Sequence, residues 1–347
     1  MSTPPSASTV RPRATIRDVA ALAGVGIKTV SRVINHEANV SPQMKDRVER
    51  AVTALNFKPN QGAGALRRGD GKTLTLGLLL DAVDNPFSAA MNRAVEVIAS
   101  ARYTAVFAAS FGDDPERERR LVDAFTRRRV DGLILTTITP DQGYLQAERE
   151  LGTPIVFVDR PPVGLVADAV LSDNYEAAVK ATQHLIDHGH RRIAHVGDET
   201  AISTARERAR GFVDALNGAG LDGSAAVQTN DLCSTEEAHA AVRHLMGLAE
   251  PPTAIFASQN MVSIGAIRAL HELGLQDEVA LIGFDDLLLA DLLQPGITVM
   301  AQNPAAIGTR AAEILFSRLD GDRSPVATTV IPTNLIVRGS GEIRPPT

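Results

Sequence analysis

The fold of the N-terminal region is decided by residues 15–35, which read TIRDVAALAGVGIKTVSRVIN. Thr15 is a favourable N-cap and Asp18 falls in the first turn, so a short helix should begin there and end near Gly24. Apolar residues at helical spacing after this glycine predict a second helix over 27–34. Two short helices joined by a turn of about three to four residues have the geometry of a helix-turn-helix.

A third helix should complete this small unit. Ser41 and Pro42 supply an N-cap and a proline at the first helical position. The apolar stripe of this helix is expected to consist of Met44, Val48, Val52 and Leu55. The sequence therefore predicts a disordered tail over 1–13 and a three-helix head over 14–58.

The distribution of charge separates the head from the rest of the chain. The 347 residues carry a net charge of -6, but residues 11–72 hold twelve Lys and Arg against five Asp and Glu. The remaining residues hold 23 against 36. A basic head joined to an acidic body favours a polyanionic partner for the head. The charge distribution alone is also compatible with a basic surface that is solvated and binds no polyanion.

The motifs of the head resemble those of the lactose/galactose-repressor family. The resemblance covers about 45 positions, through residues 15–35, Val40-Ser41-Pro42 and the LNFKPN run at 55–60. It implies a transcriptional regulator of the repressor type, which binds a pseudo-palindromic operator in double-stranded DNA as a homodimer. It also implies that a small-molecule effector controls the affinity for the operator.

The resemblance implies that side chains at the start of the second helix, and in its next turn, contact the bases of the operator. Lys28 can donate to guanine O6 and N7, and Ile27 can pack against a thymine methyl group. Contact with phosphate alone is the alternative for Lys28 and Arg32. The DNA-contacting residues expected in the head are Thr15, Ile27, Lys28, Thr29, Ser31, Arg32 and Asn35.

Residues 59–71 resemble the hinge helix of the same family. Gly62 and Gly64 each weaken an isolated helix by about 1 kcal/mol relative to alanine, so we expect this segment to be disordered without DNA. The resemblance implies that it becomes ordered when two subunits meet over the minor groove, with Leu66 as the wedge and Asn60 and Ala63 also in contact with DNA. A flexible linker without a role in DNA binding is the alternative.

From Thr73 onward, short apolar runs alternate with amphipathic stretches. This alternation predicts parallel sheets with helices on both faces, and the length suits two such lobes. The fold class is therefore α + α/β. The stretch resembles the periplasmic sugar-binding fold, which implies an effector-binding and dimerisation domain over 72–347. Strands are expected at 74–80, 105–109, 132–135, 155–158, 192–196, 254–257 and 280–282, and helices at 87–101, 116–128, 175–188, 205–219 and 261–273.

The resemblance also assigns an effector pocket, which would hold a sugar or a sugar derivative. Its polar residues are Asp159, Arg208 and Asp285, and Phe87 forms an apolar wall. Two carboxylates and a guanidinium in one cleft can bind vicinal hydroxyls bidentately. A salt bridge between the lobes, without a ligand, is the alternative for Asp159 and Arg208.

The sequence departs from the family pattern at two places in this pocket. Gln259-Asn260 replaces the usual Asn-Asp, so the amide of Gln259 lies one methylene further out and a negative charge is missing. Leu232 stands where several relatives carry an aromatic residue, so stacking on a hexose ring is not implied there.

Several other functions are not supported by the residue patterns. Cys233 is the sole cysteine, and residues 1–10 lack the pattern of an export signal, so we expect a cytoplasmic protein without a membrane segment. His184 and His188 are four residues apart, but no catalytic carboxylate follows the HExxH pattern. We therefore expect no metal, no cofactor and no enzymatic activity. A sugar-binding transport component is the alternative, but it would need an export signal.

Overall fold

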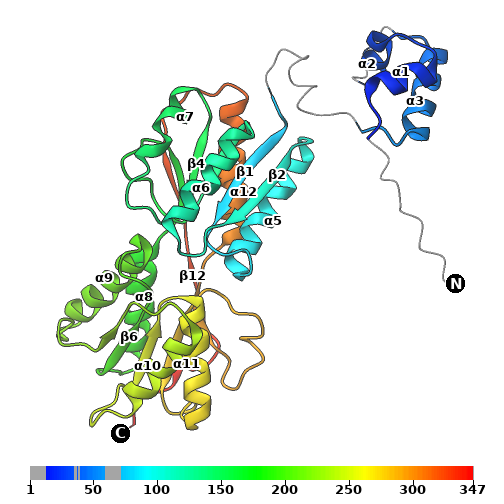
Figure 1. Ribbon diagram of the computed structural model, residues 1–347. Helices are drawn as coiled ribbons and strands as arrows, with labels where there is room; N and C mark the ends of the chain where they lie inside the picture. The colour runs from blue at the N-terminus through cyan, green and yellow to red at the C-terminus, as the bar shows by residue number, and fades with distance from the viewer. Residues whose placement is uncertain (1–12, 35–36, 38–39, 59–71, 347) are drawn as a thin grey trace, which may run out of the picture. The chain divides into compact units, whose positions relative to one another are not determined.

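The structure is a computed structural model that describes residues 13–34, 37, 40–58 and 72–346. The chain divides into two compact units: Met1–Thr73, which contains the head, and Leu74–Thr347, which we call the body (Figure 1). Within the described ranges, no helix has both the length and the apolar character that crossing a bilayer requires.

The head contains the three predicted helices, α1 (Ile16–Ala23), α2 (Ile27–Ile34) and α3 (Pro42–Ala54). Thr15 and Asp18 form a capping box at the start of α1: the Asp18 carboxylate accepts from the Thr15 backbone N–H at 2.8 Å. Gly24 ends α1 in the left-handed region, at φ 60°, which glycine adopts without steric cost. The Arg47 guanidinium donates to the Gly24 carbonyl at 3.3 Å and thereby ties this turn to α3.

The core of the head is small and consists of aliphatic side chains. Val19, Val30 and Val48 are fully buried, one from each helix, and Ala51 joins them from α3. Met44 does not belong to this core, because its side chain is 44% exposed. The predicted stripe is wrong at this residue, since Met44 lies in the first turn of α3 and the buried face begins one turn later at Val48.

The body consists of two lobes, each built around a six-stranded sheet (Figure 1). Lobe 1 has the strand order β11-β5-β4-β3-β1-β2, with all pairs parallel. Lobe 2 has the order β12-β10-β9-β8-β6-β7, with β12 antiparallel to β10. The chain passes from lobe 1 to lobe 2 after β5, returns after β10, and passes to lobe 2 again after β11.

The strands of lobe 1 are β1 (Thr75–Leu80), β2 (Ala105–Ser110), β3 (Gly132–Leu135), β4 (Ile155–Val158), β5 (Asp168–Ser172) and β11 (Thr328–Ile331). Its helices are α5 (Pro86–Ala101), α6 (Pro115–Arg127), η1 (Gly143–Leu145), α7 (Gln146–Glu150) and α12 (Pro304–Leu319). The strands of lobe 2 are β6 (Ile193–Val196), β7 (Gln228–Thr229), β8 (Ala254–Ala257), β9 (Ala280–Phe284), β10 (Thr298–Ala301) and β12 (Asn334–Ile336). Its helices are α8 (Asn174–Asp187), α9 (Ser203–Gly218), α10 (Thr235–Met246), α11 (Asn260–Leu273) and η2 (Ser340–Glu342).

The central strands of each sheet are buried on both faces by helices, whereas the edge strands β2, β7, β11 and β12 are partly exposed. Strands β1, β3 and β4 read as continuous apolar runs because both of their faces are covered. Two glycines allow helices to pack closely: a Cβ on Gly308 of α12 would lie 2.5 Å from the Met91 carbonyl oxygen of α5. A Cβ on Gly211 of α9 would lie 2.5 Å from the Tyr175 carbonyl oxygen of α8. Larger residues at these positions would push the paired helices apart.

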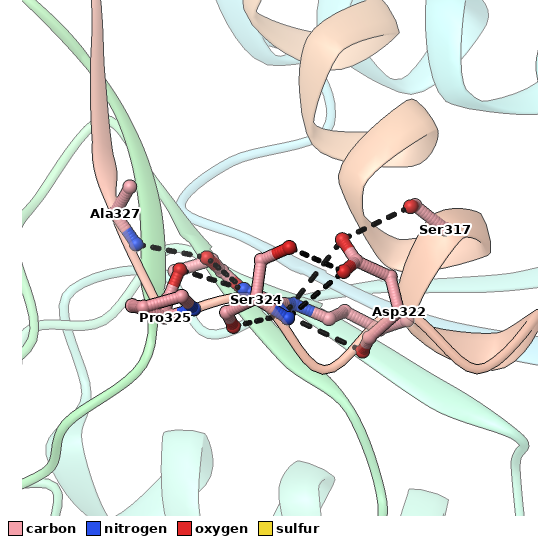
Figure 2. Close-up of polar contacts among 7 residues, drawn as sticks. Ser317, Asp322, Ser324, Pro325 and Ala327 are labelled. Atoms are coloured by element: carbon pink, nitrogen blue, oxygen red, sulfur yellow. Dashed lines mark hydrogen bonds and ion pairs between the residues drawn. The ribbon is translucent and has the colours of Figure 1, made fainter.

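The connection from α12 to β11 is fixed by a network of polar contacts (Figure 2). The Arg318 guanidinium of α12 donates to both carboxylate oxygens of Asp168, at 2.8 and 2.9 Å, and its side chain is 15% exposed. Asp168 also accepts from the Ala327 backbone N–H at 3.0 Å. Asp322 accepts from the hydroxyls of Ser317 and Ser324 within the same turn. This network anchors β11 beside β5 at the edge of the lobe 1 sheet.

Candidate functional site

The N-terminal end of α2 exposes side chains suited to contact with bases. Ile27 is 44% exposed although it is aliphatic. Lys28 is exposed and has no hydrogen-bond or ion-pair partner among the described residues. Val30 and Val33, on the opposite face of α2, are buried in the head core. The helix thus presents one polar and accessible face, which is the arrangement needed to enter a major groove.

The other residues proposed from the sequence to contact DNA differ in their exposure and in the contacts that their side chains already make. Arg32 is 3.6 Å from the Glu37 carboxylate, with both side chains about half exposed. The Thr15 hydroxyl donates to Asp18 at 2.7 Å and is therefore already part of the α1 cap. Thr29 and Ser31 are half-buried on α2. Asn35 of the head, and Asn60, Ala63 and Leu66 of the hinge, lie outside the residues that the structure describes.

The five residues proposed for the effector pocket all line one polar cavity between the lobes of the body. The volume of this cavity is about 50 Å³. Phe87, Asp159, Arg208, Gln259 and Asp285 surround it, together with Asp81, Asn85, Ser88, Thr136, Arg160, Asp198, Thr204, Asn260 and Gln302. The structure therefore brings together residues that are spread over most of the length of the body.

The carboxylates of this cavity follow the carboxyl ends of parallel strands, as expected for a site in an open α/β sheet. Asp81 follows β1 and Asp159 follows β4 in lobe 1, while Asp285 follows β9 in lobe 2. Asp159 and Asp285 both adopt left-handed φ values, of 68° and 66°. Aspartate tolerates this conformation better than most residues, and it turns the chain out of the sheet at each position.

Arg208 lies at the centre of the cavity on α9 and is only 5% exposed. Its Nε donates to Asn174 Oδ1 and its Nη1 to the Ser258 carbonyl, each at 2.8 Å. The guanidinium carbon lies 3.7 Å from the centroid of the Phe284 ring. Nη2 has no hydrogen-bond partner in the described part of the chain. The packing thus fixes the guanidinium plane and leaves one charged donor for another group.

Burial shifts the pKa of several charged groups in the cavity. It lowers the pKa of Arg208, and the negative charges of Asp285 and Asp159 oppose this shift. Burial raises the pKa of Asp285, against the attraction of Arg208 and a hydrogen bond from Gln302 at 2.9 Å. Burial likewise raises the pKa of Asp198. Such opposing shifts are typical of a functional cleft, although structural ion pairs produce them too.

The sequence reasoning missed a second arginine, Arg160, which is 7% exposed. Its Nη2 lies 3.3 Å from Asp81 Oδ2, and its Nη1 donates to the Thr137 carbonyl at 3.3 Å. Arg160 Nε and Asp81 Oδ1 are buried and have no hydrogen-bond partner among the described residues. Burial raises the pKa of Asp81 to about 6, although the charge of Arg160 opposes the rise. The position of Arg160 directly after Asp159 was the signal that could have revealed it.

The two departures from the family pattern have distinct structural roles. Gln259 caps α11, because its Oε1 accepts from the Val262 backbone N–H at 3.0 Å. Its side chain still lines the cavity. Leu232 packs against the lobe 2 core of α10 and α11 and does not line the cavity. Leu232 therefore contributes to the packing of the lobe 2 core in this chain.

Beside the polar cavity lies a larger apolar groove, with a volume of about 510 Å³. Phe87, Asn260, Asp285 and Gln302 line both spaces. The rest of the groove is mainly aliphatic and includes Met261, Ile264, Ile267, Leu287, Leu288 and Leu293. Leu288 is 90% exposed. This composition does not suit a small polar ligand.

The histidines considered as metal ligands contact other parts of lobe 2. His184 Nε2 lies 2.5 Å from Glu342 Oε1, and His188 Nδ1 lies 2.7 Å from the His184 carbonyl. His190 Nε2 lies 2.7 Å from the Ile343 carbonyl. The contacts of His184 and His190 hold η2 and the residue after it against α8 and the turn that follows α8.

Comparison with known protein families agrees with this two-part arrangement. Residues 15–60 match the family described as bacterial regulatory proteins, lacI family. Residues 182–341 match the periplasmic binding protein-like domain. The first match covers the helix-turn-helix. The second covers most of lobe 2, and also α12 and β11, with which the chain returns to lobe 1.

Similar proteins extend the match to nearly the whole chain. The HTH-type transcriptional repressor PurR of Mannheimia succiniciproducens is 30% identical over 334 residues, which cover 94% of this chain and 98% of that protein. A solved complex of the transcriptional regulator CelR with cellobiose is 32% identical with a TM-score of 0.69, covering 95% of this chain and 100% of that one. The Lac repressor dimer bound to operator and an anti-inducer shares the fold, with a TM-score of 0.83 at 22% identity over 95% of this chain and 99% of that one.

Proposed function

This chain belongs to the lacI family of bacterial regulatory proteins, and we propose that its body binds a neutral, polyhydroxylated small molecule that controls DNA binding by its head. The protein is a DNA-binding transcriptional regulator of the repressor type. In our proposal residues 14–58 bind DNA, residues 59–71 form the hinge, and residues 72–347 bind the effector and dimerise. Because its relatives are transcriptional regulators, the proposal assigns the chain no catalytic step.

For the head, we propose that Ile27 and Lys28 contact base edges. The exposed and unpaired Lys28 ammonium supports this assignment, as does the exposed aliphatic side chain beside it. Thr29, Ser31 and Asn35 would contact phosphates, and Arg32 would leave Glu37 to contact DNA. Two heads in a homodimer would read the two halves of a pseudo-palindromic operator. The related Lac repressor is a dimer bound to its operator.

For the body, the observation that carries the proposal is the polar cavity with its buried and incompletely bonded charges. Arg160 Nε, Asp81 Oδ1 and Arg208 Nη2 could each pair with a hydroxyl group, which both donates and accepts. Four carboxylates against two guanidinium groups in the lining disfavour an anionic ligand. The related CelR binds cellobiose, which is a neutral sugar.

The experiment uses the full-length protein and a DNA library. Binding-site selection should return a pseudo-palindromic sequence, and the purified protein should shift a probe that carries it. A panel of neutral sugars, sugar phosphates and sugar acids is then tested by thermal shift, because a ligand that binds only the folded state raises the melting temperature. We expect a hit among the neutral sugars that also changes the probe shift. A response confined to anionic compounds would refute the proposed ligand class.

A further inference from the structure

A single side-chain hydrogen bond joins Asn85 of lobe 1 to Asn260 of lobe 2. Asn260 Nδ2 donates to Asn85 Oδ1 at 2.8 Å, across 175 positions of sequence. Asn85 is the N-cap of α5, and Asn260 is the first residue of α11. Asn260 is 5% exposed and Asn85 is half-buried, so this bond is partly buried. Both residues line the polar cavity, and Asn260 also lines the apolar groove beside it.

The orientation of both amides is fixed by backbone groups. Asn85 Oδ1 also accepts from the Phe87 backbone N–H at 3.0 Å, which commits this oxygen to the acceptor role. Asn260 Oδ1 accepts from the Met261 backbone N–H at 2.7 Å, which turns its amide nitrogen toward Asn85. Since Asn85 already presents an acceptor, its partner must be a donor. An ionised carboxylate at position 260 would have none.

The position of this bond relates it to entry of a ligand. The polar cavity has a volume of about 50 Å³, whereas small-molecule pockets measure roughly 300–1,000 Å³. A sugar-sized molecule therefore requires the lobes to separate or shift. Gln302, which bonds to Ser172 and Asp285, lies in a segment that crosses between the lobes. Asn85 and Asn260 lie at the starts of α5 and α11 and belong to no crossover segment, so separation of the lobes at this point would break their bond.

We propose that the Asn85–Asn260 hydrogen bond is a latch that holds the two lobes closed, and that Asn260 is the positioning residue which determines how readily the cleft opens. The role in effector entry rests on the function proposed above, but the latch itself is a property of the chain without ligand. Its strength would set the fraction of molecules whose cleft is open to an effector.

Two matched substitutions test the latch, because each replaces one amide with a carboxylate at the same rim. Asn85→Asp keeps the cap of α5 and the acceptor for Asn260, so the latch should survive. Asn260→Asp keeps an acceptor for the Met261 N–H but loses the donor, so the latch should break. Hydrogen–deuterium exchange of the full chain without effector is measured in peptides spanning 80–92 and 257–268. Exchange should rise about fivefold in Asn260→Asp and stay within about twofold of the parent in Asn85→Asp.

Equal exchange in the two variants, whether raised or unchanged, would overturn the latch, and so would opening by Asn85→Asp alone. Thermal melting checks that both variants are folded. If Asn260→Asp does not fold, Asn260→Ala removes the donor without adding charge and should also raise exchange. No sugar is present in these measurements. A failure of the latch is therefore distinguishable from a failure of the sugar panel to reveal a ligand.

Discussion

In the head, the side chains expected to read bases lie on α2, a helix of eight residues, whereas the cavity of the body is lined by residues from Asp81 to Gln302. Lys28 is exposed and held by no partner among the described residues. Arg208 is 5% exposed and makes hydrogen bonds at two of its nitrogens. One region carries its proposed DNA-contacting groups on a surface, and the other fixes its proposed effector-binding groups inside a cleft.

This difference reflects the two kinds of ligand. A DNA groove accepts a helix from outside, so a short helix on a small core is sufficient and its side chains stay free until binding. A small molecule must be surrounded, so its donors and acceptors have to be fixed from several directions. The free energy of a buried charge such as that of Arg208 depends on all the groups around it. Substitution should therefore reduce ligand affinity more in the body than in the head.

Arg208→Ala should produce the largest effect. It removes the central guanidinium and leaves Asp285 without its positive neighbour, so effector affinity should fall by about 3 kcal/mol or more, roughly 100-fold. Operator binding without effector should persist, because Arg208 belongs to the body. Titration calorimetry measures the first quantity and a mobility-shift assay the second. Arg210→Ala is the matched control, since Arg210 is exposed on the same helix, stacks on the Tyr175 ring and does not line the cavity. Full effector response in Arg208→Ala would remove this residue from the pocket.

Lys28→Ala should have an intermediate effect on the head. Operator affinity should fall by about 1–3 kcal/mol, and the preference at one base pair should relax. Repeating the binding-site selection with the variant measures both. Arg50→Ala serves as the control, because Arg50 pairs with Asp46 on α3 at 2.7 Å. An unaltered selected motif with Lys28→Ala would show that this lysine contacts phosphate alone.

Acidification should have the smallest effect, and it should act on the body. Asp81 has a pKa raised to about 6 by burial, so its carboxylate takes up a proton as the pH falls through 6. If effector hydroxyls donate to the ionised form, affinity should fall about tenfold between pH 7 and pH 5. Calorimetry across this range should show the loss, and Asp81→Asn should flatten the profile. A parent profile as flat as that of the variant would exclude Asp81 from ligand binding.

The same raised pKa has a defined sign for stability. The folded body binds this proton more tightly than the unfolded chain does, so the contribution of Asp81 to stability is greatest below its unfolded pKa near 4. That contribution is lost as the pH rises from about 4 to about 6. Effector affinity and this part of the stability should therefore change in opposite directions with pH.

The sequence by itself determined the elements with strong local signals. The head helices are set by Thr15, Gly24, Ser41 and Pro42, which act within a few residues of their own positions. The buried strands β1, β3 and β4 were predicted because continuous apolar runs leave few alternatives. The five pocket residues came from a family resemblance, and the structure places them around one cavity.

Only the tertiary structure revealed the elements and contacts that depend on distant partners. Five strands were missed. The edge strands β7, β11 and β12 have exposed or half-buried faces and form by pairing with β6, β5 and β10. The strands β5 and β10 are buried inside their sheets, and their pairing with β4 and β9 revealed them. Helices α10 and α12 were also missed. Local spacing could reveal neither the pairing of Arg160 with Asp81 nor the bond from Asn260 to Asn85. Their partners lie 79 and 175 residues away, and only the meeting of strand ends and helix starts at the cleft brings them within hydrogen-bonding distance.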